Sequence, residues 1–307
     1  MTQERPRAVL LRGGSGYALT VDLEEWYHTC LVPSYVHPAA RPDLPEELDR
    51  LVPELLEILA ENRRMATFFV LGEVAERLPR RIREIAAAGH EVASHGYLHL
   101  RACERSCQEF ARDLRRSKAL LEDLVGEPVV GFRAPEWSLR SVASPCLHLV
   151  AEAGFLYDSS LAPYPFAGRL RNPRYASRLV WNGAAGRDLL ELPPLTFGGV
   201  LRLPAGSWTG RLVQPSRLAE AARAHRDAGG LPVAVVHPWE VSGRPTPGRL
   251  TGVARFIHET GRLRFASHFG ELLRALPWTT VRAAAAGLQA TAPPAIPLRT
   301  IAARRLG

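Results

Sequence analysis

Short apolar segments alternate with amphipathic segments along most of the chain, and this alternation limits the fold more than any other feature. The amphipathic segments place apolar residues at helical spacing, as Leu48, Leu51, Leu55 and Leu59 show. The apolar segments have the length of buried strands and lie at 17–21, 65–70, 91–94, 129–132, 155–157, 232–236 and 263–266. Strand–helix alternation over about seven units predicts an α/β fold with a parallel sheet that closes, or nearly closes, into a barrel.

Most of this pattern falls within one predicted catalytic domain over residues 17–280, between a lead at 1–16 and an Ala- and Pro-rich tail at 281–307. Between 159 and 210 the alternation fails, and frequent proline and glycine predict an irregular insertion over one face. One hairpin is expected inside it, pairing 179–182 with 189–192. Helices are expected at 46–62, 72–88 with an interruption at Pro79, 104–125, 215–228, 249–260 and 269–276.

Reactive side chains stand at the C-terminal ends of five of the predicted strands. Asp22, His95, Arg133, Asp158 and His237 each stand at the C-terminal end of a different strand. In barrels of parallel strands, this end of the sheet is the face that carries the active site. The sequence therefore predicts that these side chains meet on one rim.

Two histidines on this rim have the spacing of metal ligands. His95 and His99 are separated by four positions and follow the strand at 91–94, so both imidazoles can reach one ion. Catalytic zinc sites commonly use three protein ligands and leave a fourth position open. A third ligand is therefore expected from another strand end.

The carboxylates after the first strand are the nearest source of that ligand. Alternation in an extended segment places Asp22 and Glu24 on one face, so we interpret Glu24 as the ligand and Asp22 as the general base, with Glu25 as the alternative ligand. Two histidines and one carboxylate suit a zinc hydrolase or a non-haem iron oxygenase. The separate base and the distant His237 favour hydrolysis.

Six stretches of the chain, spread over residues 18 to 240, carry a resemblance to a known family. They are Thr20–Trp26, Ala66–Gly72, Ser94–His99, Arg133–Trp137, Tyr157–Ser160 and Val236–Trp239. In this order they resemble the motifs of the polysaccharide deacetylase superfamily, the NodB-homology fold of carbohydrate esterase family 4. The resemblance is closest to the branch associated with bacterial exopolysaccharide loci, in which the first motif reads D-x-E-D-W.

This resemblance implies a distorted (β/α)7 barrel and metal-dependent removal of an N-acetyl or O-acetyl group from a sugar or polysaccharide. It makes Asp22 the base, His95 and His99 metal ligands, Arg133 the residue that orients the base, and His237 the acid. The implied cofactor is a divalent metal, foremost Zn²⁺, with Co²⁺, Ni²⁺ or Fe²⁺ as alternatives. The implied partner is an N-acetylated sugar or polysaccharide.

The chain departs from the family pattern at three points. Glu24 and Glu25 stand where the commoner first motif has an aspartate next to the base, so either could be the ligand. Pro238 replaces the usual acidic residue after the last histidine. The fourth motif is not evident, and Asp158 is therefore the expected partner that adjusts the pKa of His237.

Aromatic residues beside the strand ends are candidates for substrate contact. Trp26, Trp137, Trp208 and Trp239 could stack on sugar rings, with Pro135 beside them, and packing of the rim is an equally good interpretation of the same residues. His28 is expected to be a hydrogen-bonding neighbour of the site. Two other functions fit the fold: an amidase for a small non-sugar amide, or a non-catalytic carbohydrate-binding relative. The complete set of base, ligands and acid argues against the second.

Charge and apolar content limit the partners further. The net charge is +8, but its arginines are scattered along the chain, so we expect no nucleic-acid partner. No apolar run has the length of a transmembrane segment, and the polar N-terminus lacks the apolar core of a signal peptide. We therefore expect a cytoplasmic protein, or one bound peripherally to the membrane. Cys103 and Cys107 are expected to pack in the core, and no pattern indicates an oligomeric state.

Overall fold

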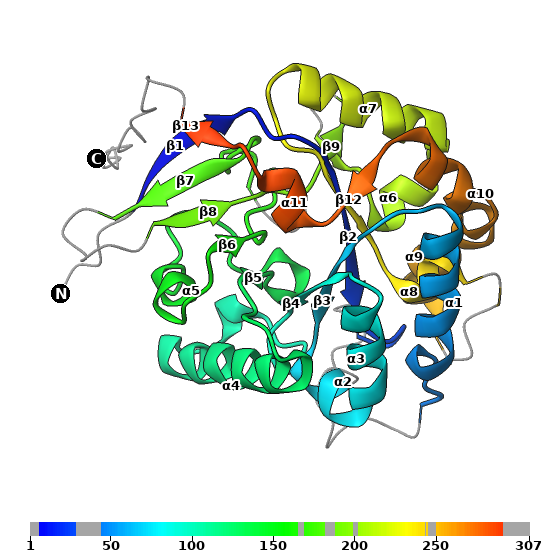
Figure 1. The fold of residues 1–307 in the computed structure, drawn as a ribbon, viewed down its shortest axis with the longest axis horizontal. Coiled ribbons are helices and arrows are strands. Elements are labelled where there is room, and N and C mark those ends of the chain that lie inside the picture. The colour runs from blue at the N-terminus through cyan, green and yellow to red at the C-terminus, as the bar shows by residue number, and fades with distance from the viewer. Residues whose placement is uncertain are drawn as a thin grey trace, which may run out of the picture.

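The computed structural model describes residues 6–28, 44–164, 169–181, 188–198, 202–242, 244 and 250–290. The strands of its main sheet are β1 (Arg7–Arg12), β2 (Tyr17–Leu23), β3 (Thr67–Val70), β4 (Glu91–Ser94), β5 (Gly131–Phe132), β6 (Tyr157–Asp158), β7 (Ser177–Val180), β8 (Leu189–Glu191), β11 (Val233–Val236), β12 (Trp278–Thr279) and β13 (Gln289–Ala290). They follow the order β11-β2-β3-β4-β5-β6-β8-β7-β1-β13, and β12 pairs with β2. Helices surround this curved sheet (Figure 1).

Every pair from β11 through β8 is parallel, whereas β8, β7, β1 and β13 pair antiparallel. The prediction of an α/β fold built on parallel strands is confirmed. The predicted hairpin is also present, because β7 and β8 pair antiparallel within the stretch that we expected to be an irregular insertion.

The two ends of the parallel series, β8 and β11, do not pair directly. The chain after β8 crosses between them and includes a small hairpin of β9 (Thr196–Phe197) and β10 (Leu203–Pro204). The Leu195 N–H donates to the Val233 carbonyl at 2.8 Å, and Gly206 forms a parallel bridge with Val235. These backbone hydrogen bonds join the segment after β8 to β11, the strand that precedes His237.

Alternating residues of β2 serve two different surroundings. Leu19, Val21 and Leu23 belong to the large apolar core between sheet and helices, while Ala18 belongs to a smaller core on the opposite side of the strand. Thr20 and Asp22 share the face of Ala18, because side chains alternate along a strand. This period brings Asp22 to the interior of the barrel at its rim.

The helices agree with the predicted periodicity except near the C-terminus. They are α1 (Leu48–Glu61), α2 (Gly72–Arg77), α3 (Pro79–Ala87), α4 (Cys107–Val125), α5 (His148–Glu152), α6 (Ser207–Arg211), α7 (Pro215–Asp227), α8 (Pro238–Val241), α9 (Gly252–Glu259), α10 (Arg262–Ala275) and α11 (Val281–Ala285). The interruption at Pro79 is present, because this proline opens α3 directly after α2. Within the described residues, no helix has both the length and the apolar character needed to span a membrane.

The strand predicted at 263–266 is wrong, because these residues form the first turns of α10. Phe265, Phe269, Leu272 and Leu273 are buried on one helical face, while Leu263 is exposed. Four residues with alternating polarity fit either period, and the longer amphipathic pattern that continues to Leu273 decides for the helix.

Both predicted terminal segments contribute to the sheet. The lead at 1–16 contains β1, which pairs with β7 and with β13. The described part of the predicted tail forms α11 and β13. The physical reason is that β1 would otherwise leave an edge of the sheet unpaired.

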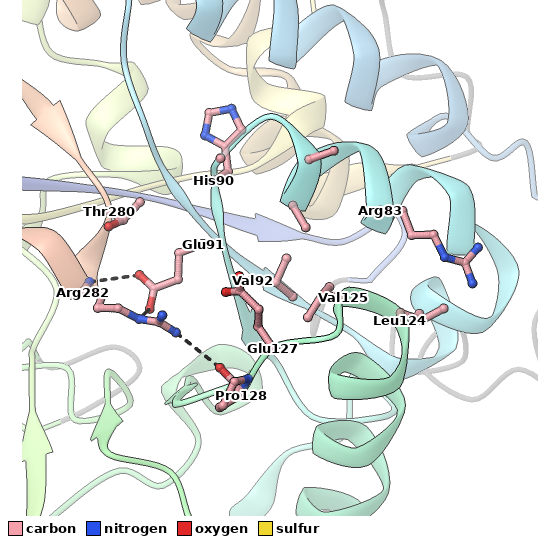
Figure 2. A pocket seen from close by; sticks show the side chains of 13 residues that line it. Arg83, His90, Glu91, Val92, Leu124, Val125, Glu127, Pro128, Thr280 and Arg282 are labelled. Atoms are coloured by element: carbon pink, nitrogen blue, oxygen red, sulfur yellow. Dashed lines mark hydrogen bonds and ion pairs between the residues drawn. The ribbon is translucent and has the colours of Figure 1, made fainter.

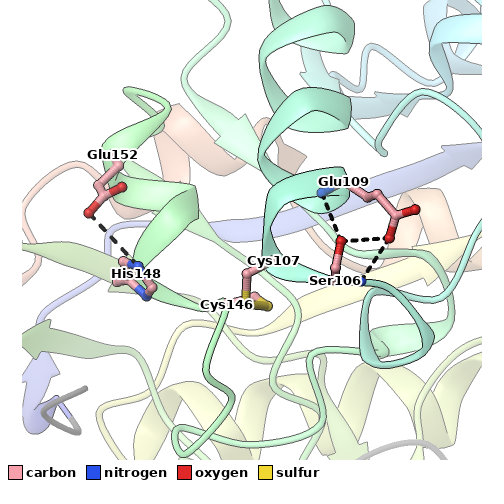
Figure 3. Close-up of a disulfide and its surroundings, with 6 residues drawn as sticks. All are labelled: Ser106, Cys107, Glu109, Cys146, His148 and Glu152. Carbon is pink, nitrogen blue, oxygen red and sulfur yellow. Dashed lines mark hydrogen bonds and ion pairs between the residues drawn. A yellow bond between two sulfur atoms is a disulfide. The ribbon is translucent and has the colours of Figure 1, made fainter. Parts of the chain in front are cut away.

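The start of α4 is fixed by a capping box and a disulfide. The Ser106 hydroxyl accepts a hydrogen bond from the Glu109 N–H, and the Glu109 carboxylate accepts one from the Ser106 N–H (Figure 3). Cys107 is bonded to Cys146, which lies just before α5. The expectation of core packing is wrong for Cys103, which is an exposed free thiol, whereas Cys107 packs against the main apolar core and is also disulfide-bonded.

A hollow of about 450 Å³ lies at the N-terminal end of β4, opposite to the predicted rim (Figure 2). Glu91 on its wall accepts hydrogen bonds from the Thr67 and Tyr157 hydroxyls and from the Arg282 N–H. These contacts join β3, β4, β6 and α11. We interpret this end as a structural closure, since its polar groups are satisfied by one another.

Candidate metal and acid–base site

The rim brings together four of the five predicted strand-end residues. Asp22 comes from the end of β2, His95 follows β4, Arg133 follows β5, and His237 follows β11. All four side chains are buried. Parallel pairing aligns the ends of β2, β4, β5 and β11 along one edge, which is why residues so distant in sequence converge.

Glu24, His95 and His99 form a buried cluster whose ligand atoms all lie within 4.8 Å of one another. The Glu24 Oε2 atom lies 2.7 Å from His99 Nε2 and 3.7 Å from His95 Nε2. Burial alone would raise the pKa of Glu24, but His99, His95 and His237 outweigh it and hold that pKa well below its ordinary value. An ionised carboxylate and two imidazoles make a donor set for a divalent cation.

The surroundings of His95 fit metal binding as well. Its Nδ1 atom lies 2.8 Å from the Arg133 carbonyl oxygen, which can accept a hydrogen bond but cannot donate one. This contact requires the proton on Nδ1 and leaves the Nε2 lone pair directed at Glu24 and His99. Such a carbonyl partner is the usual support of a metal-binding histidine. The residues present therefore fit a bound divalent metal.

Glu25, the alternative ligand, has a different task. Its carboxylate accepts hydrogen bonds from the N–H groups of Glu47 at 2.9 Å and Leu48 at 3.2 Å, and from Arg77 at 3.0 Å. Burial raises the pKa of Glu25 to about 7, although these donors oppose the shift. The geometry thus assigns Glu25 to the start of α1 and leaves Glu24 beside the histidines.

Arg133 is fully buried and binds the predicted base. Its Nη1 atom lies 2.5 Å from Asp22 Oδ1 and 2.9 Å from the Thr20 hydroxyl, and its Nη2 atom donates to the Ser159 hydroxyl at 3.0 Å. The guanidinium also lies 4.1 Å above the Phe69 ring. These contacts fix the direction in which Asp22 points and keep it next to a permanent positive charge.

His237 faces the metal-ligand cluster from the opposite side. Its Nε2 atom lies 3.3 Å from Glu24 Oε1, and its Nδ1 atom lies 2.7 Å from Glu240 Oε2. Burial lowers the pKa of His237, but Glu240 first and then Glu24 and Asp22 raise it, to about 9. Arg211 contacts the other oxygen of Glu240 at 3.0 Å.

Glu240 and Arg211 are not among the site residues predicted from the sequence, although the sequence holds a signal for Glu240. His237 is the N-cap of α8, Pro238 opens the helix, and Glu240 closes a capping box onto the His237 N–H. A carboxylate at the third helical position commonly reaches back to the cap residue. Arg211 is the last residue of α6, and no local pattern connects it to His237.

The prediction that Asp158 is the partner of His237 is wrong. Asp158 accepts a hydrogen bond from the Ser160 hydroxyl, and its carboxyl interacts electrostatically with that of Glu191. It faces away from the barrel interior because Tyr157 and Ser159 occupy the inner face of the same extended segment. Burial raises the pKa of Asp158 to about 6 and raises that of Glu191 well above its ordinary value.

This carboxyl pair predicts a pH-dependent stability. Because the folded state raises the pKa of both groups, their contribution is fully present below pH 4; that of Asp158 is lost as the pH rises through about 6, and that of Glu191 is lost at higher pH. The Glu191→Gln variant supplies an amide N–H in place of the shared proton. Between pH 5 and pH 8, we expect the unfolding free energy of the unchanged chain to fall by on the order of 2 kcal/mol more than that of Glu191→Gln. Urea unfolding at both pH values measures this, and equal losses in the two proteins would contradict it.

His28 lies beside the ligand cluster without joining it. Its Nδ1 atom accepts a hydrogen bond from the Glu25 N–H, and its Nε2 atom lies 3.0 Å from Glu73. Burial lowers the pKa of His28 to about 4. The neutral ring stacks on His99 at 5.7 Å, which supports the orientation of that residue.

The predicted substrate-contacting residues differ in what they offer. Trp26 is buried, and its indole N–H donates to the Pro45 carbonyl, so packing is its task. Trp239 is buried between His237 and the ring of His258. Pro135 and Trp137 form the short turn after Arg133. The side chain of Trp208 lies outside the described residues.

Comparison with known proteins finds similarity to polysaccharide deacetylases. Residues 43–155 match the family model "Polysaccharide deacetylase". A peptidoglycan deacetylase of Helicobacter pylori is 32% identical over 110 residues, which is 36% of each chain. A chitooligosaccharide deacetylase of Sinorhizobium fredii is 40% identical over 95 residues, 30% of this chain and 39% of that one. The chain thus matches little more than a third of these relatives.

Solved structures extend the likeness to the whole fold. A Mycobacterium smegmatis structure assigned to the polysaccharide deacetylases is 29% identical, with a TM-score of 0.51 over 89% of this chain and 96% of that one. A Pseudomonas aeruginosa structure with a similar assignment shares the fold, at 16% identity and a TM-score of 0.50 over 84% of this chain and 83% of that one. The segment at 43–155 is thus similar to polysaccharide deacetylases, and the solved structures share the fold of the chain.

Proposed function

We propose that this chain, which carries a polysaccharide deacetylase domain, removes N-acetyl groups from a sugar or polysaccharide by metal-dependent hydrolysis. One observation carries the proposal. Two ion pairs accompany the cluster of Glu24, His95 and His99. One joins Arg133 to Asp22, and the other joins His237 to Glu240. Amide hydrolysis needs a base for water and an acid for the leaving nitrogen, and this arrangement offers one of each.

Glu24, His95 and His99 would hold the metal, with Zn²⁺ first and Co²⁺, Ni²⁺ or Fe²⁺ as alternatives. When bound there, a divalent ion supplies Lewis-acid polarisation of the acyl carbonyl and lowers the pKa of a nearby water. The Arg133 carbonyl would keep His95 in the tautomer that binds, and the His28 ring would support His99.

Asp22 acts as the general base in this proposal. Its contact with Arg133 holds one carboxylate oxygen in place, so that the carboxylate can accept a proton from the attacking water. The Thr20 and Ser159 hydroxyls also accept hydrogen bonds from Arg133. These contacts hold the guanidinium, and with it Asp22, in one position. The base is therefore oriented before substrate arrives.

His237 acts as the general acid. The Glu240 carboxylate accepts a hydrogen bond from the Nδ1–H group. This contact fixes the orientation of the ring and favours the doubly protonated form of His237. The second proton, on Nε2, is then available for the leaving nitrogen, which departs as an amine only when protonated. Arg211 keeps Glu240 ionised and in place.

The first motif guides the choice of substrate. Asp22-Leu23-Glu24-Glu25-Trp26 is similar to the D-x-E-D-W form of the exopolysaccharide-locus branch, and we place the natural substrate among bacterial exopolysaccharides or their precursors on this basis. The roles of Glu24 and Glu25 in the structure fit this form, because the second carboxylate has the separate task of anchoring α1.

Metal content and acetate release together test the proposal. His95→Ala and Glu24→Ala are expected to lose both bound metal and activity, while Glu25→Ala keeps its metal. His268→Ala, on α10 away from the rim, is the matched control and should keep both. The measurements are metal analysis of the purified protein and acetate release from a panel of N-acetylated oligosaccharides. Stoichiometric metal in His95→Ala would show that the site is misassigned.

A further inference from the structure

A series of hydrogen bonds leads away from Asp158, the strand-end residue that takes no part in the acid–base site. The backbone pairing of β5 with β6 extends to the Ser159 N–H, which donates to the Phe132 carbonyl at 2.9 Å. The Ala134 N–H, two residues further along, donates to the Ser160 hydroxyl oxygen at 2.8 Å. The Ser160 hydroxyl in turn donates to Asp158 Oδ1. Two side chains thus continue the pairing where the backbone bonds of the sheet end.

The same peptide group also contacts a predicted metal ligand. The Ala134 N–H and the Arg133 carbonyl belong to one peptide bond, and this carbonyl oxygen lies 2.8 Å from His95 Nδ1. Because a carbonyl can only accept, His95 donates from Nδ1. Every donor therefore points the same way, from His95 through the peptide group and the Ser160 hydroxyl to the Asp158 carboxylate. We call this series of three hydrogen bonds the Asp158–His95 relay.

The relay is shielded from water along its whole length. Its members are almost fully buried, with 1% exposure at His95 and none at Arg133, Ala134, Ser160 and Asp158. Hydrogen bonds in such an interior are electrostatically stronger than in water, and bonds aligned in one direction polarise one another. A charge at one end of the relay therefore acts on the group at the other end.

The far end of the relay carries a negative charge at neutral pH. Burial raises the pKa of Asp158 to about 6, and it raises the pKa of the neighbouring Glu191 well above its ordinary value. Two adjacent buried carboxyls do not ionise together easily. Asp158 ionises first, and its charge adds to the rise in the pKa of Glu191. The acceptor at the end of the relay is thus a carboxylate.

We propose, on the premise of the function proposed above, that Asp158 and Ser160 are positioning residues that hold His95 in its metal-binding tautomer and strengthen Nε2 as a donor. Metal-binding histidines commonly give their other ring N–H to a carboxylate or to a backbone carbonyl, and such partners raise the basicity of the ligand nitrogen. Here the two kinds of partner act in series, because the carbonyl that His95 contacts is polarised by a hydroxyl and a carboxylate. The stretch Tyr157–Ser160 thereby supports the metal site without touching the metal.

Ser159 provides a matched control inside the same stretch. Like Ser160 it has no exposed surface. Its hydroxyl accepts a hydrogen bond from Arg133 Nη2 at 3.0 Å and donates to the Leu192 carbonyl at 2.7 Å. It therefore contacts the arginine side chain and is no member of the relay. Removal of either hydroxyl leaves a similar small gap in one segment, so the two alanine variants differ in the partner that is lost.

The affinity for Zn²⁺, measured by competition with a chromogenic chelator at pH 7.5, tests the relay. We expect Ser160→Ala to bind Zn²⁺ about 10-fold more weakly than the unchanged chain. Asp158→Asn keeps an acceptor for Ser160 but loses the charge, and it should weaken binding by about threefold. Ser159→Ala should stay within about twofold of the unchanged chain, because the His95 contact is intact.

The metal-free protein gives a second readout that needs no enzyme activity. In a nitrogen–proton correlation spectrum of the imidazole rings, the His95 signals are identified by their loss in His95→Asn. We expect the His95 Nδ1 proton to shift upfield in Ser160→Ala and in Asp158→Asn, because its hydrogen bond to the Arg133 carbonyl becomes weaker. In Ser159→Ala the signal should stay in place.

Thermal unfolding of each variant ensures that the affinities refer to folded protein. If Ser160→Ala does not fold, the nearly isosteric Asp158→Asn decides. Unchanged affinity with an unchanged Nδ1 proton in Asp158→Asn, or an equal loss of affinity in Ser159→Ala, would mean that these bonds only close the end of β6, and would overturn the inference. Absence of acetate release from every N-acetylated oligosaccharide, with the affinity difference present, would instead refute the deacetylase function and leave the relay in place.

Discussion

Asp22→Asn is expected to keep its metal and to lose about 10²–10⁴-fold in kcat, the usual worth of a positioned general base. Asparagine has nearly the shape of aspartate and can still accept a hydrogen bond from Arg133, but it cannot take a proton from water. Because the ligand cluster consists of Glu24, His95 and His99, the metal should remain. Kinetics on an N-acetylated oligosaccharide and metal analysis of the same preparation measure both quantities.

The change also leaves the Arg133 guanidinium without its ion pair in a buried site, which is destabilising. Thermal unfolding should therefore accompany the kinetics, so that a loss of folded protein is not counted as a loss of chemistry. Asp49→Asn, at an exposed carboxylate on α1, is the control for removal of a charge. Full activity in folded Asp22→Asn would exclude it as the base, and loss of metal would make it a ligand.

His237→Ala is expected to cripple deacetylation of an N-acetyl sugar, by about 10²–10⁴-fold, and to affect an activated aryl acetate much less. An amine leaves only with a proton, whereas a phenolate that carries electron-withdrawing groups leaves without one. Metal content should be unchanged, because the ligand cluster does not include His237. Rates on the two substrates with one enzyme preparation give the comparison. Equal losses on both would indicate that His237 stabilises the oxyanion.

The pH profile provides a further check on the same residue. The acid must be protonated to act, and Glu240 is the strongest of the groups that raise the pKa of His237 to about 9. Activity toward the amide should therefore fall as the pH rises through that region, while the aryl ester shows a weaker alkaline decline. In Glu240→Gln the decline should begin at lower pH, since the negative charge that favours the imidazolium is gone. An alkaline limb at the same pH in Glu240→Gln would contradict this role.

The sequence was informative wherever a local period determines the outcome. The predicted strand ends bring Asp22, His95, Arg133 and His237 to one edge of the sheet, where their side chains are buried. The alternation of side chains, applied to Tyr157, Asp158 and Ser159, would have turned Asp158 outward and away from His237. A strand end alone does not state which side of the sheet a residue faces.

Other features depend on contacts that no local pattern encodes. Arg211 reaches Glu240 from the end of α6, and its place follows from how the segment after β8 crosses to β11. The choice between Glu24 and Glu25 is decided by the position of the α1 N-terminus, which lies outside the motif itself. The disulfide likewise joins two cysteines that a helical stripe alone would leave as packing residues.

That disulfide has a consequence for the unfolded chain. Cys107 follows the segment of His95 and His99, and Cys146 follows the segment of Arg133, at a sequence separation of 39. In the chain-entropy description, closing a loop of this length lowers the conformational entropy of the denatured ensemble. The free energy of that ensemble rises by about 4 kcal/mol as a result. The ligand-bearing and arginine-bearing segments therefore stay tethered when the rest of the chain has melted. An oxidised chain begins refolding with these two parts of its reaction centre already confined to one small volume.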